Sequence, residues 1–225
     1  MRLLSAAVLA AFVLAPLAPE AQVALDLTLG PVVAFSEDVS GFQFDPDDPD
    51  ATPVQQFDAV PVPTSVGFEA GLGVIVMPGP VGVRVGAHFL NTSAVFDGEQ
   101  TFNRESLDAN FLTLQLDLRT GADLGPLRAY AFGGPEFRYL LDLSGEDLTV
   151  ASVREDARLL STAATFGAGL TFDFAGTRFG PKVSYSIDLS GVEGDDIVLD
   201  NGNVLRLDEA YDLDTLLFGI VFGGR

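Results

Sequence analysis

The chain has 225 residues, of which 48% are hydrophobic, and its mean hydropathy is positive, so a disordered acidic tail is excluded. Its formal net charge of −20 argues against nucleic acid as a partner, because the phosphates would be repelled. The chain has no cysteine, which excludes a disulfide framework, a thiolate metal site and a cysteine nucleophile.

The N-terminal stretch has the order of a secretory signal peptide. Arg2 precedes an apolar run over residues 3–17, and the small residues before Gln22 offer a cleavage site after Ala21. We therefore predict a signal peptide over residues 1–21 and a single mature domain over residues 22–225. A membrane-anchor helix is the alternative, but the apolar run is shorter than the roughly 20 residues that a span requires.

Eight stretches of the chain alternate between apolar and polar or glycine residues with a period of two, which is typical of β-strands. The clearest two form a hairpin around residues 77–80, where Val66 and Leu72 share one face and Glu69 lies on the other among glycines. Pro31 should interrupt the first strand, because proline cannot donate to a β-ladder. In chain order the predicted strands are residues 23–35, 66–76, 81–89, 111–119, 127–139, 163–174, 178–189 and 215–222.

The connections between these strands alternate in length. Short turns follow the second, fourth and sixth strands, and the other connections are long and polar. The long segments carry 23 acidic and 4 basic residues, so the negative charge gathers at one rim. They cover residues 36–63, 91–109, 142–160 and 190–212. Short turns at one rim and large loops at the other are typical of transmembrane β-barrels.

These patterns predict an all-β fold, an eight-stranded antiparallel up-and-down transmembrane β-barrel. The eleven apolar-faced residues 66–76 match the roughly 9 to 11 residues of a strand that crosses a bilayer at a tilt. The apolar face should look toward lipid and the polar face toward the barrel axis. A soluble lipocalin-like barrel is the main alternative, but it would need large apolar side chains inside.

The chain resembles the small outer-membrane β-barrel families of Gram-negative bacteria, the OmpX/OmpA-like and PorT-like group. The resemblance rests on four segments, which are residues 129–135 (AYAFGGP), 166–170 (FGAGL), 181–185 (PKVSY) and 217–222 (LFGIVF). It implies a location in the outer membrane, insertion by the barrel-assembly machinery, contact with outer-membrane lipid and lipopolysaccharide, and a monomer. It implies no particular activity. These families usually end on an aromatic residue, whereas three residues follow Phe222 here.

Charged and polar residues on the inward face form the main candidate site. In a narrow lumen such groups must be paired or hydrogen-bonded, because burial of an isolated charge is costly. Eight strands leave an interior that side chains just fill, so we expect a polar plug, with a narrow path for ions or small solutes as the alternative. The predicted network comprises Glu69, Arg84, His88, Gln115, Asp117, Arg128, Tyr130, Glu136, Arg138, Lys182 and Asp188.

Tight turns would set the partners inside this network. In the hairpin around residues 77–80, a tight turn places Glu69 opposite His88 and leaves room for Arg84 beside Gly73. The same estimate for the fourth and fifth strands places two more pairs opposite each other, Asp117 with Arg128 and Gln115 with Tyr130.

His88 is the only histidine of the chain. With Glu69 to orient it and Ser65 or Ser93 nearby, it could serve an outer-leaflet lipid-modifying enzyme, since a serine nucleophile needs an oriented base. No motif fixes either serine, however. We therefore expect a histidine satisfied within the lumen and no enzymatic activity.

Acidic residues of the long segments are the last candidates. Carboxylates for weak Ca²⁺ binding, and for a Ca²⁺ bridge to lipopolysaccharide phosphates, are offered by Asp45, Asp47, Asp48, Asp50, Asp195 and Asp196. The spacing lacks the glycine and final glutamate of an EF-hand, so solvated loops are the simpler interpretation, and we predict no cofactor. The function we predict is structural or interactive through acidic external loops, with a narrow porin-like channel as the alternative and an enzyme third.

Overall fold

The computed structural model describes eleven segments of the chain, and the predicted signal peptide and the six candidate Ca²⁺-binding aspartates lie outside them. The described residues are 22–35, 39–44, 55–60, 64–77, 81–96, 105–145, 152–153, 160–191, 197–198, 204–207 and 212–224. Within these segments, no helix has both the length and the apolar character that a membrane span requires.

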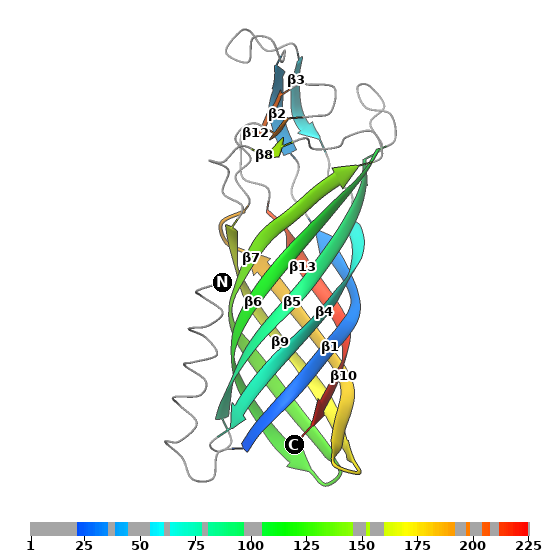
Figure 1. Ribbon diagram of the computed structural model, residues 1–225, viewed down its shortest axis with the longest axis vertical. Helices are drawn as coiled ribbons and strands as arrows, with labels where there is room; N and C mark the ends of the chain where they lie inside the picture. The colour runs from blue at the N-terminus through cyan, green and yellow to red at the C-terminus, as the bar shows by residue number, and fades with distance from the viewer. Residues whose placement is uncertain are drawn as a thin grey trace.

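Eight strands close into a barrel in which every neighbouring pair is antiparallel (Figure 1). Around the barrel their order is β1-β13-β10-β9-β7-β6-β5-β4, so each barrel strand pairs with the next along the chain, and the first pairs with the last. The predicted eight-stranded fold is confirmed. The strands are β1 (Gln22–Phe35), β4 (Ser65–Met77), β5 (Val81–Phe96), β6 (Glu105–Leu124), β7 (Leu127–Gly145), β9 (Leu160–Phe174), β10 (Thr177–Asp188) and β13 (Asp214–Gly224).

Five further strands form a second sheet in the order β3-β2-β12-β11-β8. This sheet lies beyond the loop end of the barrel, at the top of Figure 1. Its strands are β2 (Val39–Phe44), β3 (Gln55–Val60), β8 (Ser152–Val153), β11 (Ile197–Val198) and β12 (Val204–Leu207). They belong to three of the four long segments that we predicted as loops. The prediction missed them because the strands are short and pair between segments far apart in the sequence, as β2 does with β12.

Three barrel strands, β5, β6 and β7, are longer than predicted by six residues or more. The pairing of β5 with β6 runs from Val81 opposite Thr120 to Phe96 opposite Glu105, which includes most of the segment 91–109 that we predicted as a loop. Polar residues caused the error, since Asn91 and Asn110 look like loop residues in the sequence. In the barrel they face each other, and Asn91 Nδ2 donates to Asn110 Oδ1 over 2.8 Å.

The register differs from the predicted one in both hairpins that we assigned. In β4–β5, His88 lies opposite Gly71 and not opposite Glu69, a shift that keeps every side chain on its predicted face. In β6–β7, Arg128 lies opposite Asp123 and not opposite Asp117, because β6 continues five residues beyond its predicted end. The two-residue turn that follows uses Gly125 at a φ of 76°, a conformation that glycine adopts without steric cost.

The predicted interruption at Pro31 occurs on one side of β1 only. Pro31 stays paired with Phe68 of β4, whereas the ladder with β13 passes from Leu29 to Val32 without pairing the two residues between them. The register is the same before and after this gap, so the strand carries no bulge there.

Inner and outer faces alternate along the barrel strands as predicted. Leu25 and Leu72 are each 67% exposed on the outside, whereas Arg84 is 3% and Asp117 1% exposed on the inside. Large apolar residues therefore cover the exterior, and the charged side chains are enclosed by the barrel wall.

Candidate functional site

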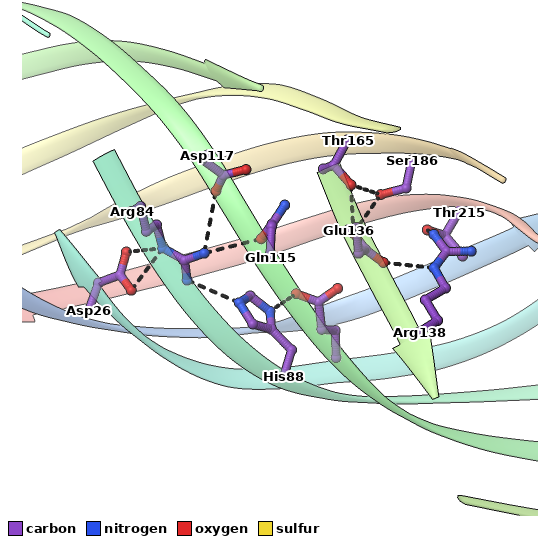
Figure 2. A network of polar contacts seen from close by, with 11 residues as sticks. Asp26, Arg84, His88, Gln115, Asp117, Glu136, Arg138, Thr165, Ser186 and Thr215 are labelled. Atoms are coloured by element: carbon purple, nitrogen blue, oxygen red, sulfur yellow. Dashed lines mark hydrogen bonds and ion pairs between the residues drawn. The ribbon is translucent and has the colours of Figure 1, made fainter. Parts of the chain in front are cut away.

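The lumen contains a cluster of charged side chains centred on Arg84 of β5 (Figure 2). Arg84 Nε donates to both carboxylate oxygens of Asp26, over 3.1 and 2.9 Å. Its Nη1 donates to Gln115 Oε1 over 3.1 Å and reaches Asp117 Oδ2 over 3.5 Å. We call these residues, with His88 and Glu69, the Arg84 cluster. A buried guanidinium thus shares its charge between two carboxylates from different strands, which offsets the desolvation of all three.

A glycine of β4 makes the room for Arg84. A Cβ atom at Gly73 would lie 2.4 Å from Asp26 Oδ1 and 2.7 Å from Arg84 Nε. The predicted space beside Gly73 is therefore present, and Asp26 occupies part of it.

His88 extends the Arg84 cluster toward Glu69. Its Nε2 lies 3.1 Å from Arg84 Nη2, and because arginine can only donate, Nε2 is the acceptor. Nδ1 therefore carries the proton and donates it to Glu69 Oε1. The predicted contact between Glu69 and His88 is present despite the different register. Both ring nitrogens are engaged, which leaves neither available as a base for a serine hydroxyl.

Two cations of the lumen lie against aromatic rings. The Arg119 guanidinium carbon is 3.5 Å from the ring centroid of Tyr130, and Arg119 Nη1 lies 3.6 Å from Asp26 Oδ2. Lys182 Nζ is 4.9 Å from the ring centroid of Phe132. These stacked geometries add cation–π attraction to buried charges.

The sequence-based network omitted Asp26 and Arg119, although Asp26 supplies the shortest ion pair to Arg84. Their positions on the polar faces of the first and fourth predicted strands carried the signal. Arg119 is on the same face of its strand as Gln115 and Asp117, which we did include. Asp26 is on the same face of the first strand as Ala24 and Thr28.

A second polar cluster surrounds Arg138 of β7, which is fully buried. Arg138 Nε donates to Glu136 Oε1 over 2.7 Å, Nη1 donates to the backbone carbonyl of Leu213, and Nη2 donates to Thr215 Oγ1 over 3.1 Å. Glu136 Oε2 accepts hydrogen bonds from Thr165 and Ser186 over 2.6 and 3.2 Å. These five side chains, Glu136, Arg138, Thr165, Ser186 and Thr215, form the Arg138 cluster in Figure 2.

Two aspartates next to the Arg138 cluster hold the ends of the segment 190–212. Asp188 accepts backbone hydrogen bonds from Ser190 and Gly191 on one side and from Leu213 on the other, over 3.0 to 3.3 Å. Asp214 accepts from the backbone nitrogen of Asp188 over 2.8 Å and from the Tyr185 hydroxyl over 2.6 Å. Asp188 Oδ2 also lies 3.7 Å from Arg138 Nη1, so Asp188 belongs to the polar network inside the barrel and at the same time anchors both ends of the segment 190–212.

The loop-side part of the lumen is apolar, which corrects the prediction of a wholly polar plug. Eight buried residues fill it, and we call them the apolar cluster: Val32, Ala34, Leu90, Ala109, Phe111, Leu140, Leu213 and Leu217. Alternation of polar and apolar residues tells which face of a strand a residue is on, but it does not tell how far along the barrel axis the residue lies. The inner positions near the loops were therefore assigned the polar character of the middle positions.

A small cavity lies beside Arg84 in the lumen. It measures about 10 Å³, which holds no more than a single water molecule. At the turn-side mouth a pocket of about 240 Å³ is lined by Asp123, Arg128, Asp173 and Arg178. Arg128 Nε lies 3.7 Å from Asp123 there, which corrects its predicted pairing with Asp117. Among the described residues, no group of three acids or histidines is placed to hold a metal ion.

The predicted pair of Gln115 and Tyr130 is not formed. Gln115 lies opposite Glu136 and not opposite Tyr130, whose cross-strand neighbour is Gly121. Gln115 instead contributes to the Arg84 cluster, and Tyr130 stacks on Arg119.

Comparison with solved structures finds small outer-membrane proteins, whereas no protein-family model and no curated protein matches the chain. The outer-membrane protein OprG from Pseudomonas aeruginosa aligns with a TM-score of 0.51 and 14% identity, covering 89% of this chain and 95% of that one. Neisserial surface protein A aligns with a TM-score of 0.50 and 8% identity, covering 90% of this chain and 98% of that one. The likeness extends over nearly the whole of each protein, and it shows that this chain has the closed β-barrel fold of these outer-membrane proteins.

Proposed function

We propose that the protein is an integral barrel of the bacterial outer membrane, with acidic external loops as its interaction surface and a closed lumen. The observation that carries this proposal is the outer face, where each of the eight strands exposes at least one large apolar side chain. A continuous apolar surface of this kind would drive aggregation in water. Acyl chains solvate it in a bilayer.

Aromatic residues near both ends of the barrel support two membrane interfaces. Phe68 and Phe89 contact each other with ring centroids 5.7 Å apart, and Phe172 and Phe179 do so at 6.1 Å near the turns. Aromatic girdles at the headgroup level are typical of transmembrane barrels.

Gel migration with and without boiling tests the membrane barrel. A folded outer-membrane barrel resists detergent, so we expect the unboiled protein to migrate at a different position from the boiled one. A single position under both conditions, together with solubility in detergent-free buffer, would contradict the proposal.

The interaction role rests on charge. Most of the net charge of −20 lies in the four long segments, three of which contribute the strands of the second sheet. Such a surface attracts divalent cations, and these can bridge to the phosphates of lipopolysaccharide. A basic protein partner would use the same attraction.

Binding to lipopolysaccharide vesicles with and without Ca²⁺ tests this role. We expect the Ca²⁺-dependent part of the binding to fall when Asp45, Asp47, Asp48 and Asp50 are all replaced by Asn. The control replaces Asp123 and Asp173 at the opposite rim by Asn, which should leave binding unchanged. Equal binding by the wild type and the loop variant would contradict a role for these acids.

The closed lumen rests on the Arg84 cluster, the Arg138 cluster and the apolar cluster, which fill successive parts of the interior. Planar-bilayer recording separates this proposal from a narrow channel. We expect no stable single-channel steps, whereas reproducible steps would favour the channel. An enzymatic role gains no support from His88, because Arg84 and Glu69 engage both of its ring nitrogens.

A further inference from the structure

A small cavity beside the Arg84 cluster has unusual walls, and we call it the lumen cavity. Its polar lining includes Thr28, Asp117, Tyr130 and Lys182. Three of these side chains have a buried atom without a hydrogen-bond partner in the protein, namely Thr28 Oγ1, Asp117 Oδ1 and the Tyr130 hydroxyl. Thr28 is fully buried, and the other two residues are at most 5% exposed.

Unsatisfied buried polar atoms are rare in folded proteins and call for a specific explanation. Here the three residues that carry such atoms line one cavity, although they belong to three different strands, β1, β6 and β7. A shared partner inside the cavity accounts for all three at once.

Lys182 gives a fourth reason for such a partner. It is 6% exposed, and among the described residues no carboxylate forms an ion pair with it. Lys182 Nζ lies instead 4.9 Å from the ring centroid of Phe132. Because Lys182 is largely buried, a hydrogen-bond acceptor beside its ammonium group would be stabilising.

We propose that the lumen cavity binds one ordered water molecule as a permanent part of the barrel interior. The water donates to Asp117 Oδ1, exchanges hydrogen bonds with the hydroxyls of Thr28 and Tyr130, and accepts a hydrogen bond from Lys182. The cavity volume of about 10 Å³ suits one molecule, and three or so hydrogen bonds are usual for a buried water.

The charges around the cavity favour water over an ion. Asp26 and the free oxygen of Asp117 would repel an anion. Arg84, Arg119 and Lys182 would repel a cation. A neutral molecule that both donates and accepts satisfies all the lining groups.

A double-mutant cycle on Thr28→Val and Tyr130→Phe tests the proposal, because each change removes only a hydroxyl. With a shared water, each single variant should lower the folding equilibrium constant by roughly fivefold, the effect of one lost hydrogen bond. The double variant should lower the folding equilibrium constant by less than the product of the two single effects, because both hydroxyls act through one water molecule. Without a water, each variant deletes an unsatisfied hydroxyl, and stability should stay the same or rise, which would overturn the proposal.

Ser161 provides a matched control. Its Oγ is also buried and unpartnered, but it does not line the lumen cavity. Ser161→Ala should therefore leave the unfolding midpoint unchanged or raise it. If Ser161→Ala lowered the midpoint as much as Tyr130→Phe, loss of a buried hydroxyl alone would explain the result, and the proposal would fail.

Crystals of the full barrel give an independent reading of the cavity contents. We expect one solvent peak within hydrogen-bond distance of Asp117, Tyr130 and Thr28, and its disappearance or displacement in Tyr130→Phe. An anomalous peak after a bromide soak would identify an anion, and one after a rubidium soak a cation. Either anomalous peak, or an absence of density in well-resolved maps, would overturn the proposal.

Discussion

The two parts of the lumen are filled in different ways by the same strands. β5 contributes Arg84 and His88 to the Arg84 cluster and, at the next inward position, Leu90 to the apolar cluster. β6 likewise contributes Asp117 to one and Phe111 to the other. On the inner face of each strand, charged side chains thus give way to apolar side chains within a few residues.

The charged clusters and the apolar cluster should respond differently to the loss of one side chain. A charged cluster is stable only as a complete set, since removal of one member leaves its partners buried without compensation. An apolar cluster loses stability gradually, according to the volume removed. The apolar cluster also lies between the Arg84 cluster and the loop end of the barrel.

Replacement of Arg84 should have the largest effect. Arg84→Met leaves Asp117 buried and unpaired and leaves Asp26 only its contact with Arg119 Nη1 at 3.6 Å, so we expect the free energy of unfolding to fall by about 3–5 kcal/mol. Urea unfolding from lipid vesicles measures this change. The double variant Arg84→Met with Asp117→Asn should recover part of the loss because the orphaned charge is removed. No recovery would show that packing, and not charge, is the main contribution of Arg84.

Replacement of Leu90 in the apolar cluster should cost less. Leu90 is 1% exposed, and Leu90→Ala should lower the free energy of unfolding by about 3 kcal/mol through lost apolar contacts and a residual cavity. The matched variant Leu90→Met keeps most of the volume and should cost less than about 1.5 kcal/mol. Equal losses in the two variants, measured by the same urea assay, would contradict a volume-dependent filling.

The sequence identified the barrel because its signals are local and repeated. Period-two alternation, connections of alternating length and acidic loops all depend on neighbouring residues, so the inner face of each strand could be assigned. Partner choice within the lumen depends on register and on strand length. The five extra residues of β6 therefore moved Arg128 from Asp117 to Asp123. Asp26 of β1 pairs with Arg84 of β5 across one intervening strand, β4, where Gly73 leaves room for both side chains. The second sheet pairs segments distant in sequence and left no local signal.

A smaller loss should follow from removing one uncharged acceptor of Arg84. Gln115→Leu deletes the oxygen that accepts from Arg84 Nη1 over 3.1 Å but leaves both carboxylates in place. We expect the free energy of unfolding to fall by about 2 kcal/mol, as for a buried hydrogen bond to a charged group. A loss as large as that of Arg84→Met would mean that Gln115 organises the whole cluster.

The smallest effect is expected at the loop rim, where Tyr185 donates to Asp214 Oδ2 over 2.6 Å. Tyr185→Phe removes this bond, yet Asp214 keeps its bond from the backbone nitrogen of Asp188, and water can reach the partly exposed rim. The free energy of unfolding should therefore fall by about 1 kcal/mol or less in the urea assay. Tyr185→Phe and Gln115→Leu each delete one hydrogen bond to a charged partner, so their difference measures the effect of enclosure within the barrel. Equal losses would show that enclosure in the lumen does not set the cost of breaking a polar contact.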